Sequence, residues 1–188
     1  MIYSKKIEFT SPCNMLRRSV LSGLVVLLSW FMVGCSVFDD PLPSYSDTSI
    51  VNVGDRAPHF VVESIEGELL SVAGESDPAT LLVLFSHTCP DCKALLDAIQ
   101  KRINDGVVPP RIVAVARGGE GVEIREFVQQ NGYTFPIAAN PDAEIYYQYA
   151  TMYVPRCYVI DNEGYVQYIS FEDSANKIDT LFSHTALL

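Results

Sequence analysis

The stretch TLLVLFSHTCPDCKALL, residues 80–96, joins a strand pattern to a helix pattern through a pair of cysteines. Thr80 to Phe85 is a continuous apolar run of the type found in strands that are covered on both faces. After Pro90 the apolar residues recur at helical spacing, at Ala94, Leu95, Leu96, Ala98, Ile99 and Ile103. The stretch therefore predicts a central strand that leads directly into a helix, with the cysteines at the junction.

Strand and helix patterns alternate beyond this stretch. Arg111 to Ala116 is a second strand of buried type, and helical spacing follows from Val122 to about Gly132. A turn signal at Asp161 to Gly164 precedes a further strand, Tyr165 to Ser170. This alternation predicts an α/β fold with a central mixed sheet flanked by helices.

A β-hairpin is predicted on the N-terminal side of the central strand. Two short strand-like runs, Val61 to Ser64 and Leu69 to Val72, flank a turn signal at Glu66-Gly67. We therefore expect an N-terminal hairpin extension in a single domain that spans residues 51–188.

The first 34 residues have the composition of an export signal. Basic residues precede an apolar run from Val20 to Val33, and Gly34 and Cys35 follow at once. This order is typical of a signal peptide, and the run is shorter than the roughly 20 residues that a transmembrane helix needs. Gly34-Cys35 also resembles the lipobox of bacterial lipoproteins, so residues 1–34 are predicted to be removed and Cys35 to be lipidated. The alternative is an uncleaved membrane anchor.

Residues 35–50 contain prolines and several serines and show little periodicity, so they are predicted to be a flexible spacer. Under either interpretation of the N-terminus, the domain lies outside the cytoplasm and beside a membrane. We expect a lipid-anchored location in the cell envelope, on the periplasmic side.

The charge of the exported part narrows the choice of partners. Four of the 13 Lys and Arg residues and one of the 23 Asp and Glu residues precede Cys35, which leaves a net charge near −13. Such an acidic surface argues against nucleic acid and anionic lipid headgroups as partners. Attachment to the membrane must then depend on the acyl chains.

The number of cysteines indicates a working site. Cys13 would leave with the signal peptide and Cys35 would carry lipid, which leaves Cys89, Cys92 and Cys157 as thiols. A small disulfide scaffold would show an even number of cysteines spread along the chain. One close pair and one single cysteine fit thiol chemistry better.

A Cys-x-x-Cys pair at the start of a helix has a clear division of roles. The N–H groups at the helix N-terminus favour a thiolate at Cys89, which we expect to be the nucleophile. Cys92, on the first helical turn, is placed to attack a mixed disulfide and release the partner. Pro90 presets the first turn. The carboxylate of Asp91 opposes the thiolate, so we expect the pair to be poised toward reduction.

These pieces together resemble thioredoxin-like proteins, and most closely the TlpA/ResA-like group of membrane-tethered thioredoxins. The resemblance covers nearly all of residues 51–172. It is carried by the motifs VGDRAPHF at 53–60, LVLF at 82–85, CPDCK at 89–93, Val154-Pro155 and YVIDNEG at 158–164.

The resemblance implies a thioredoxin-like fold and a thiol-disulfide oxidoreductase of the cell envelope, acting as a reductase. Protein thiols and disulfides would be its substrates, and an upstream membrane electron donor would supply it. It implies no cofactor besides a Cys89–Cys92 disulfide. It also implies that Val154-Pro155 contains a cis peptide bond and offers backbone groups to a substrate strand.

Three residues depart from the pattern of the group. Thr88 stands where a tryptophan is frequent, and Val83 stands where many thioredoxins have a buried acid. Cys157 is an addition, which we interpret as a buried strand residue; the alternative is a third redox thiol able to trap Cys89 or Cys92.

Other functions remain open. His87 with the cysteine pair gives three groups that could bind a soft metal, but structural zinc needs a fourth ligand, so no metal is expected and His87 is interpreted as a polar neighbour of Cys89. Pro58-His59-Phe60 also resembles the start of peroxiredoxins, which favours a peroxidase, although Ser86 and Leu82 stand where those enzymes have Thr and Pro. A binding module that uses the groove at Val154-Pro155 without turnover is the third possibility.

Overall fold

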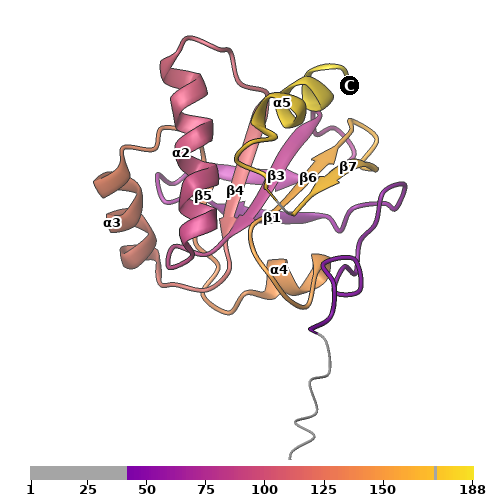
Figure 1. Cartoon of the computed structure of the whole chain (residues 1–188), viewed down its shortest axis with the longest axis horizontal. Coiled ribbons are helices and arrows are strands. Elements are labelled where there is room, and N and C mark those ends of the chain that lie inside the picture. Colours follow the sequence, from indigo (N-terminus) through magenta and orange to yellow (C-terminus); the bar gives the residue numbers. More distant parts are fainter. Residues whose placement is uncertain (1–41, 172) are drawn as a thin grey trace, which may run out of the picture. The chain divides into compact units, whose positions relative to one another are not determined.

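A five-stranded mixed sheet forms the centre of the fold (Figure 1). The computed structural model describes residues 42–171 and 173–188. The strand order is β5-β4-β3-β6-β7, in which β4 is parallel to β3 and β5, whereas β6 is antiparallel to β3 and β7. The strands are β3 (Thr80–Phe85), β4 (Arg111–Ala116), β5 (Ile137–Ala138), β6 (Arg156–Ile160) and β7 (Val166–Ser170). The predicted mixed sheet is confirmed.

Strand β3 is the middle strand of the sheet, and all six of its residues are buried. It pairs with β4 on one side, where Leu82 faces Val113, and with β6 on the other, where Val83 faces Cys157. Alternate residues of a strand point to opposite faces of the sheet. A strand that is buried at every position must therefore have both faces covered.

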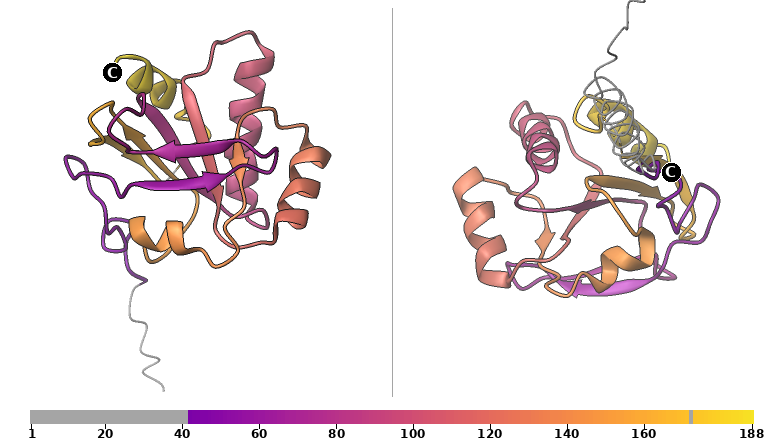
Figure 2. Two further views of the ribbon diagram at one scale, coloured as in Figure 1. Left: turned by 180° about the vertical axis from the view of Figure 1, so that it is seen from behind. Right: turned by 60° about the horizontal axis from the view of Figure 1, so that its bottom comes forward.

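Helices cover one face of the sheet, and the hairpin with a short helix covers the other (Figure 2). Leu81, Val83 and Phe85 of β3 pack in the same core cluster as the buried residues of three helices, whereas Leu82 and Leu84 pack on the hairpin side. The three helices are α2 (Pro90–Asn104), α3 (Gly121–Asn131) and α5 (Ile178–Ala186), and the hairpin side holds β1 (Phe60–Glu63), β2 (Leu69–Val72) and α4 (Glu144–Tyr149).

The predicted hairpin is confirmed. β1 and β2 form an antiparallel pair in which Phe60 faces Val72 and Glu63 faces Leu69. Gly67 lies in the connecting turn with φ of +87°, a conformation that costs glycine little. An isolated bridge between Ser64 and Ala138 joins the hairpin region to β5.

The compact unit extends on the N-terminal side of residue 51, where the domain is predicted to begin. The compact unit begins at Pro43, Thr48 is buried, and Ser49 forms an isolated bridge with Ala150. Part of the expected spacer, residues 35–50, is therefore an ordered part of the domain, because polar groups of residues 45–49 bind a buried arginine described below.

Several expectations concern residues that the structure does not describe. The signal peptide at residues 1–34, the lipidated Cys35 and the spacer up to residue 41 lie outside the described ranges. Between residues 42 and 188, leaving out 172, no helix has the length and apolar character required to cross a membrane.

Candidate active site

Cys89 lies at the N-terminus of α2, at the end of the short connection from β3. It is the N-cap residue, with φ of −93° and ψ of 121°, and Pro90 occupies the first helical turn. The N–H of Cys92 donates a hydrogen bond to the Cys89 sulfur over 3.4 Å. The side chain is partly exposed. An accessible sulfur that accepts a hydrogen bond at a helix N-terminus is suited to act as the nucleophile.

Cys92 lies one turn further on and is completely buried. Burial raises the pKa of its thiol well above the ordinary value of 9.0, although a hydrogen bond from the N–H of Ser86 to the Cys92 sulfur, 3.4 Å long, acts in the opposite direction. The structure holds both cysteines as free thiols. Cys92 is thus a protonated thiol that is shielded from solvent, whereas the neighbouring thiol of Cys89 is partly exposed to solvent.

The loop before β6 supplies the opposite side of the site. The Cys89 thiol donates a hydrogen bond to the carbonyl oxygen of Val154 with a sulfur–oxygen distance of 3.7 Å, and the peptide bond between Val154 and Pro155 is cis. Asp91 is exposed beside the cysteines. A cavity of about 620 Å³ opens here, and both Asp91 and Pro155 line it.

Cys157 lies in the core, in the middle of the sheet. It pairs with Val83 across β6 and β3, and it belongs to the same apolar cluster as Cys92. Burial raises the pKa of its thiol to about 12. In this position Cys157 is inaccessible to a partner protein, as expected of a buried strand residue.

His87 lies against α3. Its ring is 6.2 Å from the ring of Phe127, and an added Cβ on Gly119 would lie 3.0 Å from its Nδ1. Within the described part of the chain, its buried Nδ1 has no hydrogen-bond partner. The same residues contain no group of three or more His, Cys, Asp or Glu side chains arranged to hold a metal ion. His87, Cys89 and Cys92 are therefore not brought together as a metal site.

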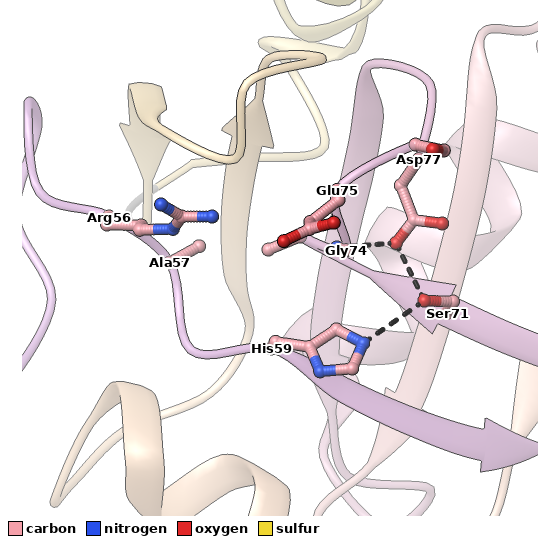
Figure 3. A pocket seen from close by; sticks show the side chains of 9 residues that line it. Arg56, Ala57, His59, Ser71, Gly74, Glu75 and Asp77 are labelled. Carbon is pink, nitrogen blue, oxygen red and sulfur yellow. Dashed lines mark hydrogen bonds between the residues drawn. The ribbon is translucent and has the colours of Figure 1, made fainter.

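A larger cavity, of about 770 Å³, lies near the hairpin, and neither cysteine of the pair lines it (Figure 3). The carboxylate of Asp77 accepts hydrogen bonds from the Ser71 hydroxyl at 2.8 Å and from the Gly74 N–H at 2.7 Å, and Nε2 of His59 lies 3.4 Å from the same hydroxyl. These hydrogen bonds stabilise the turn after β2, so we assign a structural role to His59, Ser71 and Asp77.

One residue at the site was not identified from the sequence. The guanidinium of Arg156 is fully buried and donates hydrogen bonds to the Thr48 and Ser49 hydroxyls at 2.6 and 2.7 Å, and to the carbonyls of Tyr45 at 3.1 Å and Met152 at 2.9 Å. Among the residues described, no carboxylate forms an ion pair with it. Its only sequence signal is a charged residue next to Pro155 in an otherwise apolar strand.

Comparison with known proteins agrees with this geometry. Residues 53–169 match the model of the AhpC/TSA family. The chain is 24% identical over 140 residues to "Thiol-disulfide oxidoreductase ResA" of Bacillus cereus, an alignment that covers 72% of this chain and 79% of the relative.

Two solved structures have the same fold. StoA from Bacillus subtilis superposes with a TM-score of 0.56 at 21% identity, covering 66% of this chain and 96% of StoA. A thiol:disulfide interchange protein of the thioredoxin family from Chlorobium tepidum gives the same TM-score at 19% identity, covering 71% and 97%. The predicted thioredoxin-like fold is confirmed.

Proposed function

The chain belongs to the AhpC/TSA family, and from this membership we propose that it is a thiol-disulfide oxidoreductase that uses the Cys89 and Cys92 thiols. The observation that carries the proposal is the contrast between these two groups. Cys89 is accessible at a helix N-terminus, and Cys92 is a buried thiol whose backbone N–H binds the Cys89 sulfur. This is the arrangement that two successive exchange steps require.

The reaction proceeds by two displacements at sulfur. The Cys89 thiolate attacks one sulfur of a substrate disulfide, so that a mixed disulfide forms and the other substrate sulfur leaves as a thiolate. Cys92 then loses its proton and attacks the Cys89 sulfur, which releases the second substrate thiolate and leaves a Cys89–Cys92 disulfide. The substrate gains two electrons, and two protons accompany them to give two thiols.

We also propose a direction and a location for the reaction, both from features of the sequence. Asp91 is exposed next to Cys89, and this negative charge beside the nucleophile supports a reductase. A membrane-bound dithiol donor would return two electrons to the Cys89–Cys92 disulfide. The lipobox-like Gly34-Cys35 supports attachment of the domain to an envelope membrane through lipid on Cys35.

Trapping tests the proposal. A Cys92→Ala variant lacks the second displacement, so partner proteins should accumulate as mixed disulfides on Cys89, and reductant should release them. Cys89→Ala should trap nothing, and Cys157→Ala, with an intact pair, should turn over as the natural chain does.

Two other outcomes would contradict the proposal. A chain that forms no adduct and reduces no protein disulfide would be a binding module. Catalytic consumption of hydrogen peroxide that depends on Cys89, without reduction of protein disulfides, would identify a peroxidase.

A further inference from the structure

The groove of about 620 Å³ beside Cys89 has walls from distant parts of the chain. Asp91 and Ala94 come from the first turns of α2, Phe171 and Asp173 from the connection between β7 and α5, and Tyr45 from the N-terminal segment. Pro155 also lines it, directly after the residue whose carbonyl lies 3.7 Å from the Cys89 sulfur. The groove is therefore continuous with the proposed redox site.

Aromatic side chains form one wall of the groove. The rings of Tyr45 and Phe171 stack with their centroids 5.1 Å apart and their planes 6° apart. The centroid of the Tyr153 ring lies 4.6 Å from that of Tyr45. The buried guanidinium of Arg156 lies 5.8 and 5.6 Å from the Tyr45 and Phe171 rings. Because Arg156 also binds the Tyr45 carbonyl, the wall is fixed in place.

The charged side chains that line the groove are acidic. Asp91 and Asp173 are both exposed, and among the described residues that line the groove none is Lys, Arg or His. One oxygen of Asp173 accepts a hydrogen bond from the Asn176 amide at 2.5 Å, which leaves the other oxygen for a ligand. Arg156 donates its hydrogen bonds to carbonyls and hydroxyls behind the wall, so it does not neutralise these carboxylates.

Carboxylates beside an aromatic wall are complementary to a long cationic side chain. The aliphatic stem of lysine or arginine packs on ring faces, its charge is attracted to the rings, and its N–H groups pair with carboxylates. We propose that the groove selects protein disulfides in which an extended segment carries Lys or Arg beside the cysteine that Cys89 attacks. The inference rests on the proposed function and specifies its substrate class.

The test compares peptide disulfides that are identical except for one residue beside the cysteine, which is Lys, Gln or Glu. The rate constant for oxidation of the reduced protein should be about tenfold higher for Lys than for Gln at low salt, lower still for Glu, and the preference should shrink as salt is raised. Asp173→Asn and Tyr45→Leu should each reduce the Lys-to-Gln ratio. Asp105→Asn, which removes an exposed carboxylate at the other end of α2, is the matched control and should leave the ratio unchanged.

Equal rates for the three peptides would overturn the inference while leaving thiol-disulfide exchange intact. An equal loss of preference in Asp105→Asn and Asp173→Asn would also overturn it, because the effect would then come from net charge. A chain that reacts neither with the peptides nor with a small aromatic disulfide would refute the proposed function and, with it, the substrate preference.

Discussion

The sulfur of Cys89 and the carbonyl oxygen of Val154 lie 3.7 Å apart, although 65 positions of sequence separate the two residues. The contact joins the N-terminus of α2 to the loop before β6, and it leaves Cys89 partly exposed while Cys92 and Cys157 are buried. The three thiols of the described domain therefore differ sharply in accessibility.

Alkylation should reveal this difference. Iodoacetamide at pH 8 should modify Cys89 quickly in the reduced native protein, whereas Cys92 and Cys157 should react only after unfolding, because burial hides them and raises their pKa. Peptide mapping by mass spectrometry over time measures the order. Modification of Cys157 as fast as Cys89 would show that the core opens readily and that a third redox thiol is available.

Burial of Cys157 should also make the protein sensitive to alkali. Above the ordinary thiol value of 9.0, an unfolded chain loses the Cys157 proton, whereas the folded chain keeps it until its raised pKa of about 12. Unfolding then releases a proton. The contribution of the buried Cys157 thiol to the free energy of unfolding is therefore complete below pH 9 and is lost as pH rises toward 12. Cys157→Ala should reduce the fall in the free energy of unfolding between pH 9 and 11, by up to about 1.4 kcal/mol per pH unit.

Urea unfolding in the presence of reductant, at several pH values, measures this slope in both proteins. Other buried groups with raised pKa values, such as Tyr149 and Tyr158, contribute equally to both, so the difference isolates Cys157. Identical slopes would mean that the Cys157 thiol is exposed to solvent in the folded state.

Gly119 and Gly118 offer a matched pair for testing the packing of His87. Both have positive φ, +90° and +80°, so alanine strains the backbone similarly at either position. An added Cβ at Gly119 would lie 3.0 Å from His87 and 2.9 Å from Ile124, whereas at Gly118 the nearest atom is 3.9 Å away. Gly119→Ala should therefore destabilise the protein by about 1–3 kcal/mol more than Gly118→Ala.

Chemical denaturation gives the two free energies, and NMR of the imidazole protons reports whether the ring of His87 moves. Equal losses for the two alanine variants would show that His87 is free to shift away from Gly119.

A chain that starts at residue 51 should be less stable than one that starts at Pro43. The shorter chain lacks the Tyr45, Thr48 and Ser49 acceptors, so the Arg156 guanidinium keeps only the carbonyls of its own loop. Hydrogen bonds to a charged group are each worth about 1.5–3 kcal/mol, although water replaces part of this. We expect a loss of at least about 2 kcal/mol in urea unfolding, and equal stability would refute the importance of the segment.

The parts of the fold that follow local pattern could be predicted from the sequence. Leu81 to Phe85 are all apolar because both faces of β3 are covered, and the turn signal at Gly67 predicts the hairpin. The position of the cysteine pair at the start of α2 could be predicted as well, because the junction of strand and helix depends only on residues that are neighbours in the chain.

Contacts between polar residues that lie far apart in the chain produce no periodic pattern in the sequence. The segment around Thr48 and Ser49 has the composition of a spacer, and its order depends on Arg156, more than 100 positions away. The same holds for the aromatic wall of the groove, where Tyr45 meets Phe171. Polar and aromatic contacts of this kind have no period, so only the folded structure reveals them.

The bonds of Arg156 to residues 45–49 have a consequence for protein engineering. Replacing residues 43–50 with the linker of a relative would leave the buried Arg156 with only the carbonyls of its own loop, unless the arginine were replaced as well. Residues 43–50 and the loop that carries Arg156 should therefore be exchanged together. A chimera should be joined before Pro43, so that every residue bonded to Arg156 is kept.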